Sequence, residues 1–403
     1  MRFLLLNQFY PPDAAPTGQF LHDVACALAL RGHAVRVLCS RRSYDGGRRF
    51  PAHESLDGVD IVRLPAPSYG RGSFIGKLTD YAGFTTALAL AVLSDRPRPD
   101  LVLALTTPPL LGLAARGVAA VRGCRHAHWV MDVYPDVMAA HGMITAGGVA
   151  ERALAVIARA ELRGSALTLA LGPVIARRVE AHASGPVAWV PLWGDAGITP
   201  WPDGRPVPLR AERGWDGDLV LMYSGNMGLG HRFREFLEAA RRLGRGGPRW
   251  AFCGGGKRRA EVEAFARGHG EARVELHPYV ARERLGEALA AGDVHLATLD
   301  AAWQGLMVPS KIQGIFAAGR PVIFVGGGEN ELAGWIREAG AGWVVAENDV
   351  EGLLAAIAQA RDAGERARRG AAARRFAESH FDAATNVARI VRMLEEAAGH
   401  GGR

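Results

Sequence analysis

Short apolar runs alternate with longer segments of helical period almost from one end of the chain to the other. In the segment 18–31, apolar residues recur every three or four positions, as on one face of a helix, and Gly32 follows as a stop signal. Such alternation is typical of βα units built around a parallel sheet. The strands expected in the first half are 3–6, 35–39, 61–64, 101–105, 128–131 and 167–171.

The alternation breaks at residues 191–217, which contain five Pro and five Gly and have no sustained period. It restarts afterwards, with strands expected at 219–223, 250–253, 274–276, 294–297, 322–325 and 343–345. We therefore predict an α/β fold of two Rossmann-like domains that face each other across a cleft. The expected boundaries are 1–192 for the first domain, 193–217 for a linker, 218–375 for the second domain, and 376–403 for a C-terminal helix that packs back on the first domain.

Composition narrows the class of protein. The chain of 403 residues is 49% hydrophobic and 22% charged, which suits a soluble protein of two domains. Its formal charge of +7 is spread over helical segments without a basic stripe interleaved with aromatics, so we expect no nucleic-acid partner. The four cysteines lie far apart and form no CxxC, which indicates neither a zinc site nor a disulfide framework and favours a reducing cytoplasm.

No apolar run reaches the ~18 to 20 residues of a membrane-spanning helix. The first run stops at Asn7 and is expected to be a buried strand rather than a secretion signal. The longest apolar stretch, 82–93, fits either a core helix or a helix that lies in a membrane interface. The second interpretation predicts peripheral contact with the inner face of the plasma membrane.

Three glycine-containing turns follow expected strands, at the edge where open α/β sheets bind ligands. The first has a single Gly18 instead of GxGxxG, and it fits either close approach of a ligand or a helix start introduced by Thr17. In the second, YSGNMGLGHRF at 223–233, His231 is either solvated or a donor to a phosphate or sugar hydroxyl. The third, FCGGGKRRAEVEAFA at 252–266, lacks the spacing and the Ser or Thr of a P-loop, which argues against ATP hydrolysis.

Two further segments carry candidate chemistry. HAHWVMDVYPDVM at 126–138 places Asp132 just after an apolar strand, where a carboxylate can bind sugar hydroxyls or can cap the next turn. VPSKIQGIFAAGRPVIFVGGG at 308–328 places Ser310 and Lys311 at a helix start, where they can hold an anion or serve as an N-cap. We find no HExxH motif and no convincing ligand spacing, so metal-dependent chemistry is not expected.

Taken together, these segments resemble the GT-B glycosyltransferases of family 4, in particular bacterial sugar transferases of capsule, O-antigen and colanic-acid type exopolysaccharide assembly. The resemblance covers nearly the whole chain and depends on the order and spacing of NQFYPPDAAPTGQFLHDVACALALRGHAVRVLC, TTPPLLGLAA, HWVMDVYPD, YSGNMGLGH and VPSKIQGIFAAGRPVIFVGGGENELAGWI. It implies retaining, metal-independent transfer of a hexosyl or N-acetylhexosaminyl group from a nucleotide-diphosphate sugar, with UDP-sugars favoured. The acceptor would be a glycan or a lipid-linked sugar and would meet the first domain, whereas the donor would meet the second.

The resemblance also implies roles for residues of this sequence. Asp132, His231 and Lys311 would take catalytic positions. Ser310 and Lys311 would hold the donor diphosphate, and the HPYV segment would meet the base. The expected donor-binding residues are Gly18, Gly225, Asn226, Pro278, Tyr279, Val280, Ser310, Lys311, Glu329 and Glu331.

One departure from the family pattern concerns two glutamates that many members carry eight positions apart, the second of which holds the ribose. Leu306 and Gly314 occupy these positions here, so Glu329 or Glu331 is expected to substitute. Two alternatives stay open. A nucleotide-sugar 2-epimerase of the same architecture would turn over its donor without an acceptor, and a non-catalytic nucleotide-sugar-binding subunit would bind the donor without transfer.

Overall fold

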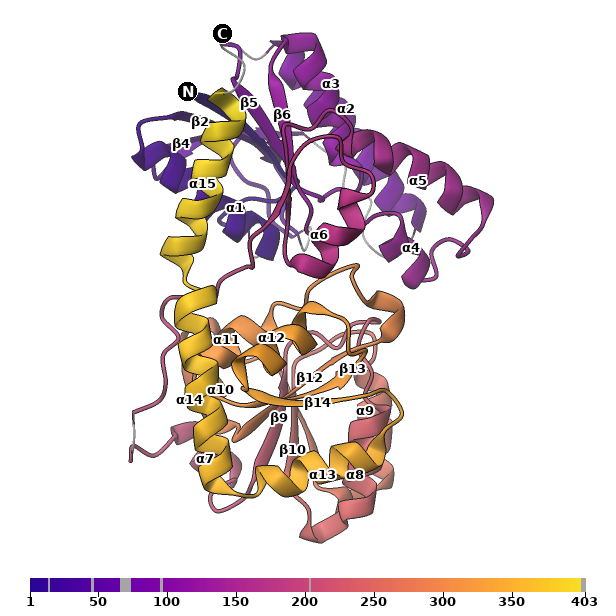
Figure 1. Cartoon of the computed structure of the whole chain (residues 1–403), viewed down its shortest axis with the longest axis vertical. Coiled ribbons are helices and arrows are strands. Elements are labelled where there is room, and N and C mark those ends of the chain that lie inside the picture. Colours follow the sequence, from indigo (N-terminus) through magenta and orange to yellow (C-terminus); the bar gives the residue numbers. More distant parts are fainter. Residues whose placement is uncertain (14, 45–46, 66–73, 95–96, 203, 400–403) are drawn as a thin grey trace. The chain divides into compact units, whose positions relative to one another are not determined.

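The computed structural model describes residues 1–13, 15–44, 47–65, 74–94, 97–202 and 204–399, without the side chains of 74, 75, 77, 78, 93 and 94. The chain divides into two compact units (Figure 1). Residues 1–191 and the C-terminal segment from Ala384 form the first unit, and residues 192–383 form the second. Each unit has its own predominantly parallel sheet flanked by helices, which confirms the two-domain α/β fold.

An eight-stranded sheet forms the centre of the first unit, in the order β3-β4-β2-β1-β5-β6-β7-β8. Only β3 and β4 pair antiparallel among its described strands. The strands are β1 (Arg2–Leu6), β2 (Ala34–Ser40), β3 (His53–Leu56), β4 (Val59–Leu64), β5 (Leu101–Ala104), β6 (Arg125–Trp129), β7 (Leu167–Ala170) and β8 (Val187–Trp189). The helices are α1 (Pro16–Leu30), α2 (Phe74–Ser94), α3 (Leu111–Arg122), α4 (Asp136–Ala140), α5 (Val149–Leu162), α6 (Pro173–Glu180) and α15 (Ala383–Gly399).

A six-stranded parallel sheet forms the centre of the second unit, in the order β11-β10-β9-β12-β13-β14. The strands are β9 (Val220–Ser224), β10 (Arg249–Cys253), β11 (Val274–His277), β12 (Val294–Leu299), β13 (Val322–Gly326) and β14 (Gly342–Val345). The helices are α7 (Pro208–Arg213), α8 (Arg234–Leu243), α9 (Arg259–Gly268), α10 (Leu285–Ala291), α11 (Lys311–Ala317), α12 (Glu331–Ala339), α13 (Val350–Ala360) and α14 (Ala363–His380).

Central strands of both sheets are buried along their whole length, as in β5, β7, β12 and β13. Helices cover both faces of such strands, so they are apolar almost throughout instead of alternating. Strand β6 begins at Arg125, three residues before the expected start at 128, because the polar residues Arg125 and His126 pair in register with β5. Periodicity therefore located most of the strands, but it missed β3 and β8 of the first sheet and misplaced the start of β6, which carries polar residues.

The apolar stretch 82–93 lies within α2. Phe84, Leu88 and Val92 are buried and pack with residues of α3 and the first sheet, so the core-helix interpretation accounts for this face. The opposite face carries exposed threonines and Leu90, whose side chain is 64% exposed. Among the described residues, no helix combines the length and the apolar character needed to cross a bilayer.

The Pro-rich segment 192–217 is part of the second unit and contains α7. The backbone N–H of Leu209 donates a hydrogen bond to Glu287 of α10 (2.7 Å). Buried Trp215, just after α7, also donates its indole N–H to Glu275 of β11 (2.9 Å). These contacts fix the segment on the second unit.

Helix α15 belongs to the first unit, which comes almost entirely from the other end of the chain. Its Glu395 accepts hydrogen bonds from Arg31 Nε (2.8 Å) and from His33 Nε2 (2.7 Å). The Ala397 carbonyl accepts another from Arg125 of β6 (2.8 Å). The last helix is therefore tied to the first unit by charged and backbone groups as well as by its apolar face.

Candidate functional site

Loops at the carboxyl ends of β9 and β12 flank the point at which the strand order of the second sheet reverses. Open α/β sheets bind ligands in the crevice outside this point. His231, in the loop after β9, joins the two strands because its Nδ1 donates to the Thr298 carbonyl of β12 (2.7 Å). The bond leaves Nε2 as the free acceptor nitrogen.

His231 is buried, so the alternative of a solvated loop histidine was wrong. Burial and the nearby Lys311 charge lower its pKa to about 3, and the imidazole is neutral at physiological pH. A neutral ring whose Nδ1 already donates to Thr298 offers Nε2 as an acceptor in a fixed direction, so the expected role as a donor was wrong. It can accept a hydrogen bond from a sugar hydroxyl or from a protonated phosphate oxygen.

Lys311 begins α11, and its ammonium group lies beside this loop. Nζ donates hydrogen bonds to the Tyr223 hydroxyl and to the Asn226 carbonyl (3.4 Å), and it lies 3.6 Å from the centre of the Tyr223 ring. No carboxylate of the described part of the chain forms an ion pair with it. Burial lowers the pKa of Lys311 well below its usual value. The site thus contains a desolvated amine whose charged form an anion would stabilise.

Two glycine-bearing loops pack closely beside Lys311. Gly225 has φ +124°, and a Cβ at that position would lie 2.9 Å from Lys311 Cε. Gly254, after β10, has φ +133°, and a Cβ there would lie 2.2 Å from the Gly225 carbonyl oxygen. Both positions therefore require glycine for conformation and for space. Asn226, which follows Gly225 in the first loop, is exposed, and its backbone carbonyl accepts the hydrogen bond from Lys311.

The HPYV segment follows β11 at the same edge of the sheet. The Tyr279 ring packs over Gly254 and Gly255, its hydroxyl donates to the Gly255 carbonyl (3.3 Å), and the residue is 59% exposed. Pro278 is exposed and Val280 is half-buried. A flat aromatic ring held against backbone at a strand end can stack on a planar ligand.

Ser310 is the N-cap residue of α11, but its side chain makes no capping hydrogen bond. The simple capping interpretation is therefore wrong, and the exposed hydroxyl is available next to Lys311. Glu329 is exposed in the turn after β13, whereas Glu331 is buried in the first turn of α12. Of the two expected substitutes for the ribose-binding carboxylate, only Glu329 has its side chain at the surface.

The two positions of the missing glutamates are apolar. Leu306 is buried, and a Cβ on Gly314 would lie 3.5 Å from the terminal methyl groups of Ile198 and Leu289. Gly314 has no positive φ and the added atom would make ordinary contacts. The chain has thus filled this side of α11 with hydrocarbon where a carboxylate would be usual.

In the first unit, the strand order reverses between β1 and β5. The loop after β1 is tied to this point because the Gln8 N–H donates to the Thr107 carbonyl (2.8 Å). Helix α1 begins at Pro16 with Ala15 as N-cap, so Thr17 does not introduce it. A Cβ on Gly18 would lie 2.7 Å from the Phe9 carbonyl oxygen. Gly18 therefore makes room for the loop after β1, and the atom that approaches it closely belongs to the protein and not to a ligand.

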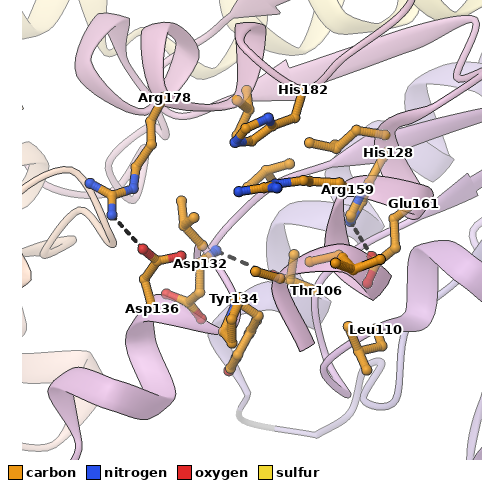
Figure 2. A pocket seen from close by; sticks show the side chains of 18 of the residues that line it. Thr106, Leu110, His128, Asp132, Tyr134, Asp136, Arg159, Glu161, Arg178 and His182 are labelled. Atoms are coloured by element: carbon orange, nitrogen blue, oxygen red, sulfur yellow. Dashed lines mark hydrogen bonds and ion pairs between the residues drawn. The ribbon is translucent and has the colours of Figure 1, made fainter. Parts of the chain in front are cut away.

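A cavity of about 530 Å³ opens at the carboxyl ends of β5, β6 and β7 in the first unit (Figure 2). Asp132 lies in it, held by a hydrogen bond from its own backbone N–H to the Thr106 hydroxyl (3.3 Å). Arg178 of α6 pairs with Asp136 at one side. The other charged and polar lining residues are Glu151, Arg152, Arg159, Glu161, His128, His182 and Tyr134.

Burial shifts three titratable groups of this cavity. It raises the pKa of Asp132 to about 6 and that of Glu161 to about 8, and it lowers the pKa of His128 to about 4. Nε2 of His128 lies 3.7 Å from Oε2 of Glu161. A Cβ on Gly112 of α3 would lie 2.5 Å from that same oxygen, so the glycine makes room for the carboxyl. Near neutral pH the His128–Glu161 pair is mainly uncharged, and Asp132 is the ionised group.

The structure thus brings Gly225, Asn226, His231, Tyr279 and Lys311 to one edge of the second sheet. Gly18 and Asp132 lie in the first unit, at the corresponding edge of its own sheet. Sequence reasoning missed the Tyr223 contact with Lys311 and the Glu161 carboxyl in the cavity. No local pattern marks Glu161, since only the fold shows that this acid near the end of α5 lies against Gly112 and His128.

Comparisons with known proteins agree with this arrangement. Residues 17–193 match the family described as Glycosyl transferase 4-like domain, and residues 218–362 match that described as Glycosyl transferases group 1. The putative colanic acid biosynthesis glycosyl transferase WcaI of Escherichia coli strain K12 is 25% identical and covers 89% of this chain and 92% of its own.

Solved structures of the same fold include sucrose-phosphate synthase from Thermosynechococcus elongatus, with a TM-score of 0.78, 14% identity and coverage of 98% of both chains. Anabaena HepE in complex with UDP-glucose has a TM-score of 0.69 and 14% identity, over 98% of this chain and 100% of its own. The two family domains stand in tandem, one on each unit. This chain therefore belongs to the GT-B glycosyltransferases and is a glycosyltransferase.

Proposed function

We propose that this enzyme transfers a sugar, with retention of anomeric configuration, from a UDP-sugar to a glycan or lipid-linked acceptor in cell-surface polysaccharide synthesis. The observation that carries the donor assignment is the Lys311 ammonium, which is desolvated and lacks a carboxylate partner among the described residues. A diphosphate supplies the missing negative charge. The relatives support the choice, since HepE was solved with UDP-glucose and WcaI is named for colanic acid biosynthesis.

The donor would lie across the strand ends of the second unit. Its diphosphate would meet Lys311, the exposed Ser310 hydroxyl and the glycine loop at Gly225. The base would stack on the exposed Tyr279 ring. As the sugar–phosphate bond breaks, negative charge grows on the diphosphate, and groups fixed beforehand around that charge stabilise the transition state more than the ground state.

Retention follows if the acceptor hydroxyl attacks the anomeric carbon on the face from which the diphosphate departs. The bond from that carbon to the diphosphate oxygen breaks, and the bond to the acceptor oxygen forms. The departing phosphate oxygen takes the proton of the hydroxyl, so the chain need not supply a separate base. Under this proposal, His231 and Asp132 form hydrogen bonds with sugar hydroxyls.

The acceptor is proposed to bind in the cavity at Asp132. Arg152, Arg159 and Arg178 line it, and cationic side chains of this kind suit a phosphate-bearing acceptor. Helix α5 also exposes apolar side chains beside it, with Val149 84% and Val156 65% exposed. A lipid-linked acceptor offers both a phosphate and a hydrocarbon chain, which fits cations next to an exposed apolar helix face better than a free sugar does.

Thermal-shift measurements with UDP-glucose, UDP-galactose, UDP-N-acetylglucosamine and GDP-mannose test the donor assignment. A UDP-sugar should raise the melting temperature in a concentration-dependent manner, since a ligand of the native state stabilises it by mass action. The stabilising donor is then incubated with and without polyprenyl-diphosphate-linked sugars. Release of UDP only with an acceptor, and a product with the donor's anomeric configuration, are the expected results.

Other outcomes would select the alternatives. Conversion of the donor sugar without an acceptor would indicate a 2-epimerase. Donor binding without UDP release for every acceptor would indicate a non-catalytic subunit, and a product of opposite anomeric configuration would contradict retention.

A further inference from the structure

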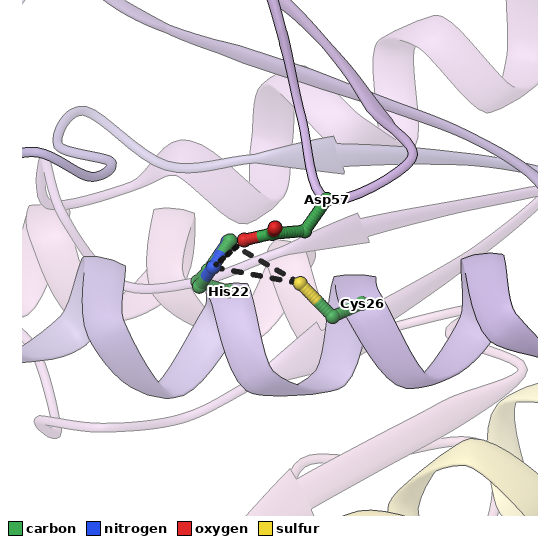
Figure 3. A group of neighbouring side chains, drawn as sticks. All are labelled: His22, Cys26 and Asp57. Carbon is green, nitrogen blue, oxygen red and sulfur yellow. Dashed lines mark hydrogen bonds and ion pairs between the residues drawn. The ribbon is translucent and has the colours of Figure 1, made fainter.

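Three side chains with metal-binding atoms gather in the first unit, away from the cavity at Asp132 (Figure 3). His22 and Cys26 are one turn apart on α1, so they project from the same face of that helix. Asp57 reaches them from the turn between β3 and β4, and its Oδ2 lies 3.1 Å from His22 Nε2. Cys26 Sγ lies 3.5 Å from His22 Nε2, and one ligand atom from each residue lies within 4.8 Å of the others.

The turn that carries Asp57 has a defined geometry. Asp57 has φ +52° and the following Gly58 has φ +80°, which are the left-handed values of a two-residue hairpin turn. A Cβ on Gly58 would lie 3.4 Å from Ala29 Cβ, so the turn packs directly on α1. The carboxylate is therefore brought to the helix by the hairpin rather than by a free loop.

His22 also has a partner on its other nitrogen. The hydroxyl of buried Tyr10 lies 2.9 Å from Nδ1, and the two rings form a T-shaped contact with their centroids 5.4 Å apart. In the metal-free protein Nε2–H donates to the Asp57 carboxylate, so Nδ1 accepts the hydrogen bond of the Tyr10 hydroxyl. When Nε2 binds a metal instead, the ring proton moves to Nδ1, which then donates to the tyrosine oxygen. Ligating histidines are commonly held in this way by a partner outside the ligand set.

We propose that His22, Cys26 and Asp57 form a Zn²⁺ site, with water as the fourth ligand. Zinc accepts imidazole, thiolate and carboxylate together, at about 2.0–2.3 Å, so tetrahedral ligands stand about 3.3–3.6 Å apart. The distances from His22 Nε2 to the other two ligand atoms, 3.1 and 3.5 Å, are close to that spacing. Magnesium and calcium prefer all-oxygen ligand sets, which this group does not provide.

Binding requires a small local change and the loss of one proton. Sγ is 3.5 Å from both ring nitrogens and so lies over the ring face, away from the direction of the Nε2 lone pair. Rotation of the Cys26 side chain about its Cα–Cβ bond would carry the sulfur toward an ion on the Nε2 side, while Tyr10 keeps the ring in place. Zinc then displaces the thiol proton of Cys26 to solvent and forms the metal–sulfur bond. A search for CxxC does not detect such a group, because His22 and Cys26 come from one helical turn and Asp57 from a distant hairpin.

A Cys–His–Asp group could instead act as a nucleophilic triad. Such a nucleophile would hydrogen-bond in the plane of one ring nitrogen, but here the sulfur is equidistant from both. Asp57 also lies on Nε2, while Nδ1 belongs to Tyr10. The arrangement fits a shared ion better than a proton relay from sulfur to carboxylate.

The ion would join three parts of the first unit. It ties α1 to the β3–β4 hairpin, and through His22 and Tyr10 it reaches the loop after β1, whose Phe9 carbonyl lies against Gly18. Zinc should therefore stabilise the folded first unit without touching the donor groups of the second. This prediction separates the metal site from the proposed transfer reaction, because zinc binding can be measured without donor or acceptor.

The test uses tag-free, full-length, chelator-treated protein titrated with Co²⁺, whose thiolate complexes absorb strongly in the near ultraviolet. One equivalent of Co²⁺ should give a thiolate-to-cobalt band that Zn²⁺ abolishes by competition. Cys26→Ser should lose the band, and Cys124→Ser should keep it, since Cys124 is another half-buried thiol of the first unit. Asp57→Asn should weaken Co²⁺ binding about 10- to 100-fold.

Asp57→Asn also guards against misfolding, because Asn adopts left-handed turn conformations readily and should preserve the hairpin. Zn²⁺ should raise the melting temperature of the wild type and of Cys124→Ser, and leave that of Cys26→Ser unchanged. Absence of a thiolate band in the wild type would overturn the proposal. An undiminished band in Cys26→Ser, or unchanged affinity in Asp57→Asn, would overturn it equally.

Discussion

Replacing Lys311 by methionine tests the proposed diphosphate site most directly. Methionine keeps an unbranched apolar side chain of similar length and removes the charge. The variant loses a hydrogen bond between the lysine and a bound diphosphate, and a hydrogen bond to a charged group contributes about 1.5–3 kcal/mol. The Coulomb energy of two unit charges ~4 Å apart sets an upper limit of ~4 kcal/mol at an effective dielectric constant of about 20. We therefore expect the dissociation constant of UDP to rise about 10- to 150-fold.

The free protein should respond in the opposite way. Burial lowers the pKa of Lys311 in the folded state, so the charged form opposes folding. This penalty is absent at high pH and grows as pH falls from the unfolded pKa, about 10.4, toward the lowered folded pKa. Lys311→Met should therefore keep or raise the melting temperature at pH 7, which distinguishes loss of binding from loss of structure.

Isothermal titration calorimetry in buffers of different ionisation enthalpy measures both effects. UDP should raise the pKa of Lys311 again, so binding to the wild type should take up a proton at pH values above the lowered pKa. Lys311→Met should abolish this uptake. The exposed Lys257, which follows Gly256 in the neighbouring loop, provides the matched charge removal. UDP affinity within twofold of wild type in Lys311→Met would refute the assignment, the more so if Lys257→Met lost affinity.

Three further predictions concern single groups. Asp132→Asn should lower kcat/KM about 10- to 100-fold, and it should remove the fall in kcat/KM below pH 6 that protonation of Asp132, with its pKa of about 6, gives the wild type. If kcat/KM of Asp132→Asn fell below pH 6 as it does in the wild type, the pH–rate profiles would contradict this prediction. Burial raises the Glu161 pKa to about 8, so its contribution to stability is present at low pH and is lost as pH rises toward 8, by up to ~1.4 kcal/mol per pH unit. Urea unfolding at pH 6, 7 and 8 should show this loss in the wild type and not in Glu161→Gln; parallel curves would argue against it. Gly225→Ala should weaken UDP binding because its φ of +124° and the adjacent Lys311 Cε exclude a Cβ, whereas Gly314→Ala should leave binding intact and add ~0.5–1 kcal/mol to the free energy of unfolding. Equal UDP affinities for the two alanine variants would contradict the prediction for Gly225. A lower melting temperature for Gly314→Ala than for the wild type would contradict the prediction for Gly314.

Alternation and glycine placement were enough to predict two predominantly parallel sheets, and the edge of each where candidate site residues gather. Strands such as β12 and β13 are buried throughout, so their apolar runs are unambiguous in sequence. The parts that could not be predicted depend on packing between distant segments. Gly18 illustrates this, because the sequence shows a missing side chain and only the structure shows that the Phe9 carbonyl fills the space.

For the candidate site residues, too, the sequence indicated positions, whereas their contacts could be seen only in the structure. Lys311 was recognised from its place before an apolar helix, but its lack of a carboxylate partner within the described chain could be seen only in the structure. His231 was ambiguous in sequence, since nothing local indicates that Thr298, 67 residues away, accepts its hydrogen bond. Electrostatic character is a property of the folded surroundings, so residue type and spacing indicate where to look and not what charge is found there.

Helix α15 has a consequence for the synthesis of the protein. The first unit needs this helix, which contributes buried Ile390, Val391 and Leu394 and the Glu395 contacts with Arg31 and His33. Ribosomes deliver the N-terminal part of that unit first and its closing helix last, after the whole second unit. During translation the nascent first unit therefore waits with an uncovered apolar surface, and a stop codon anywhere before Ile390 would leave the shortened protein with that surface exposed.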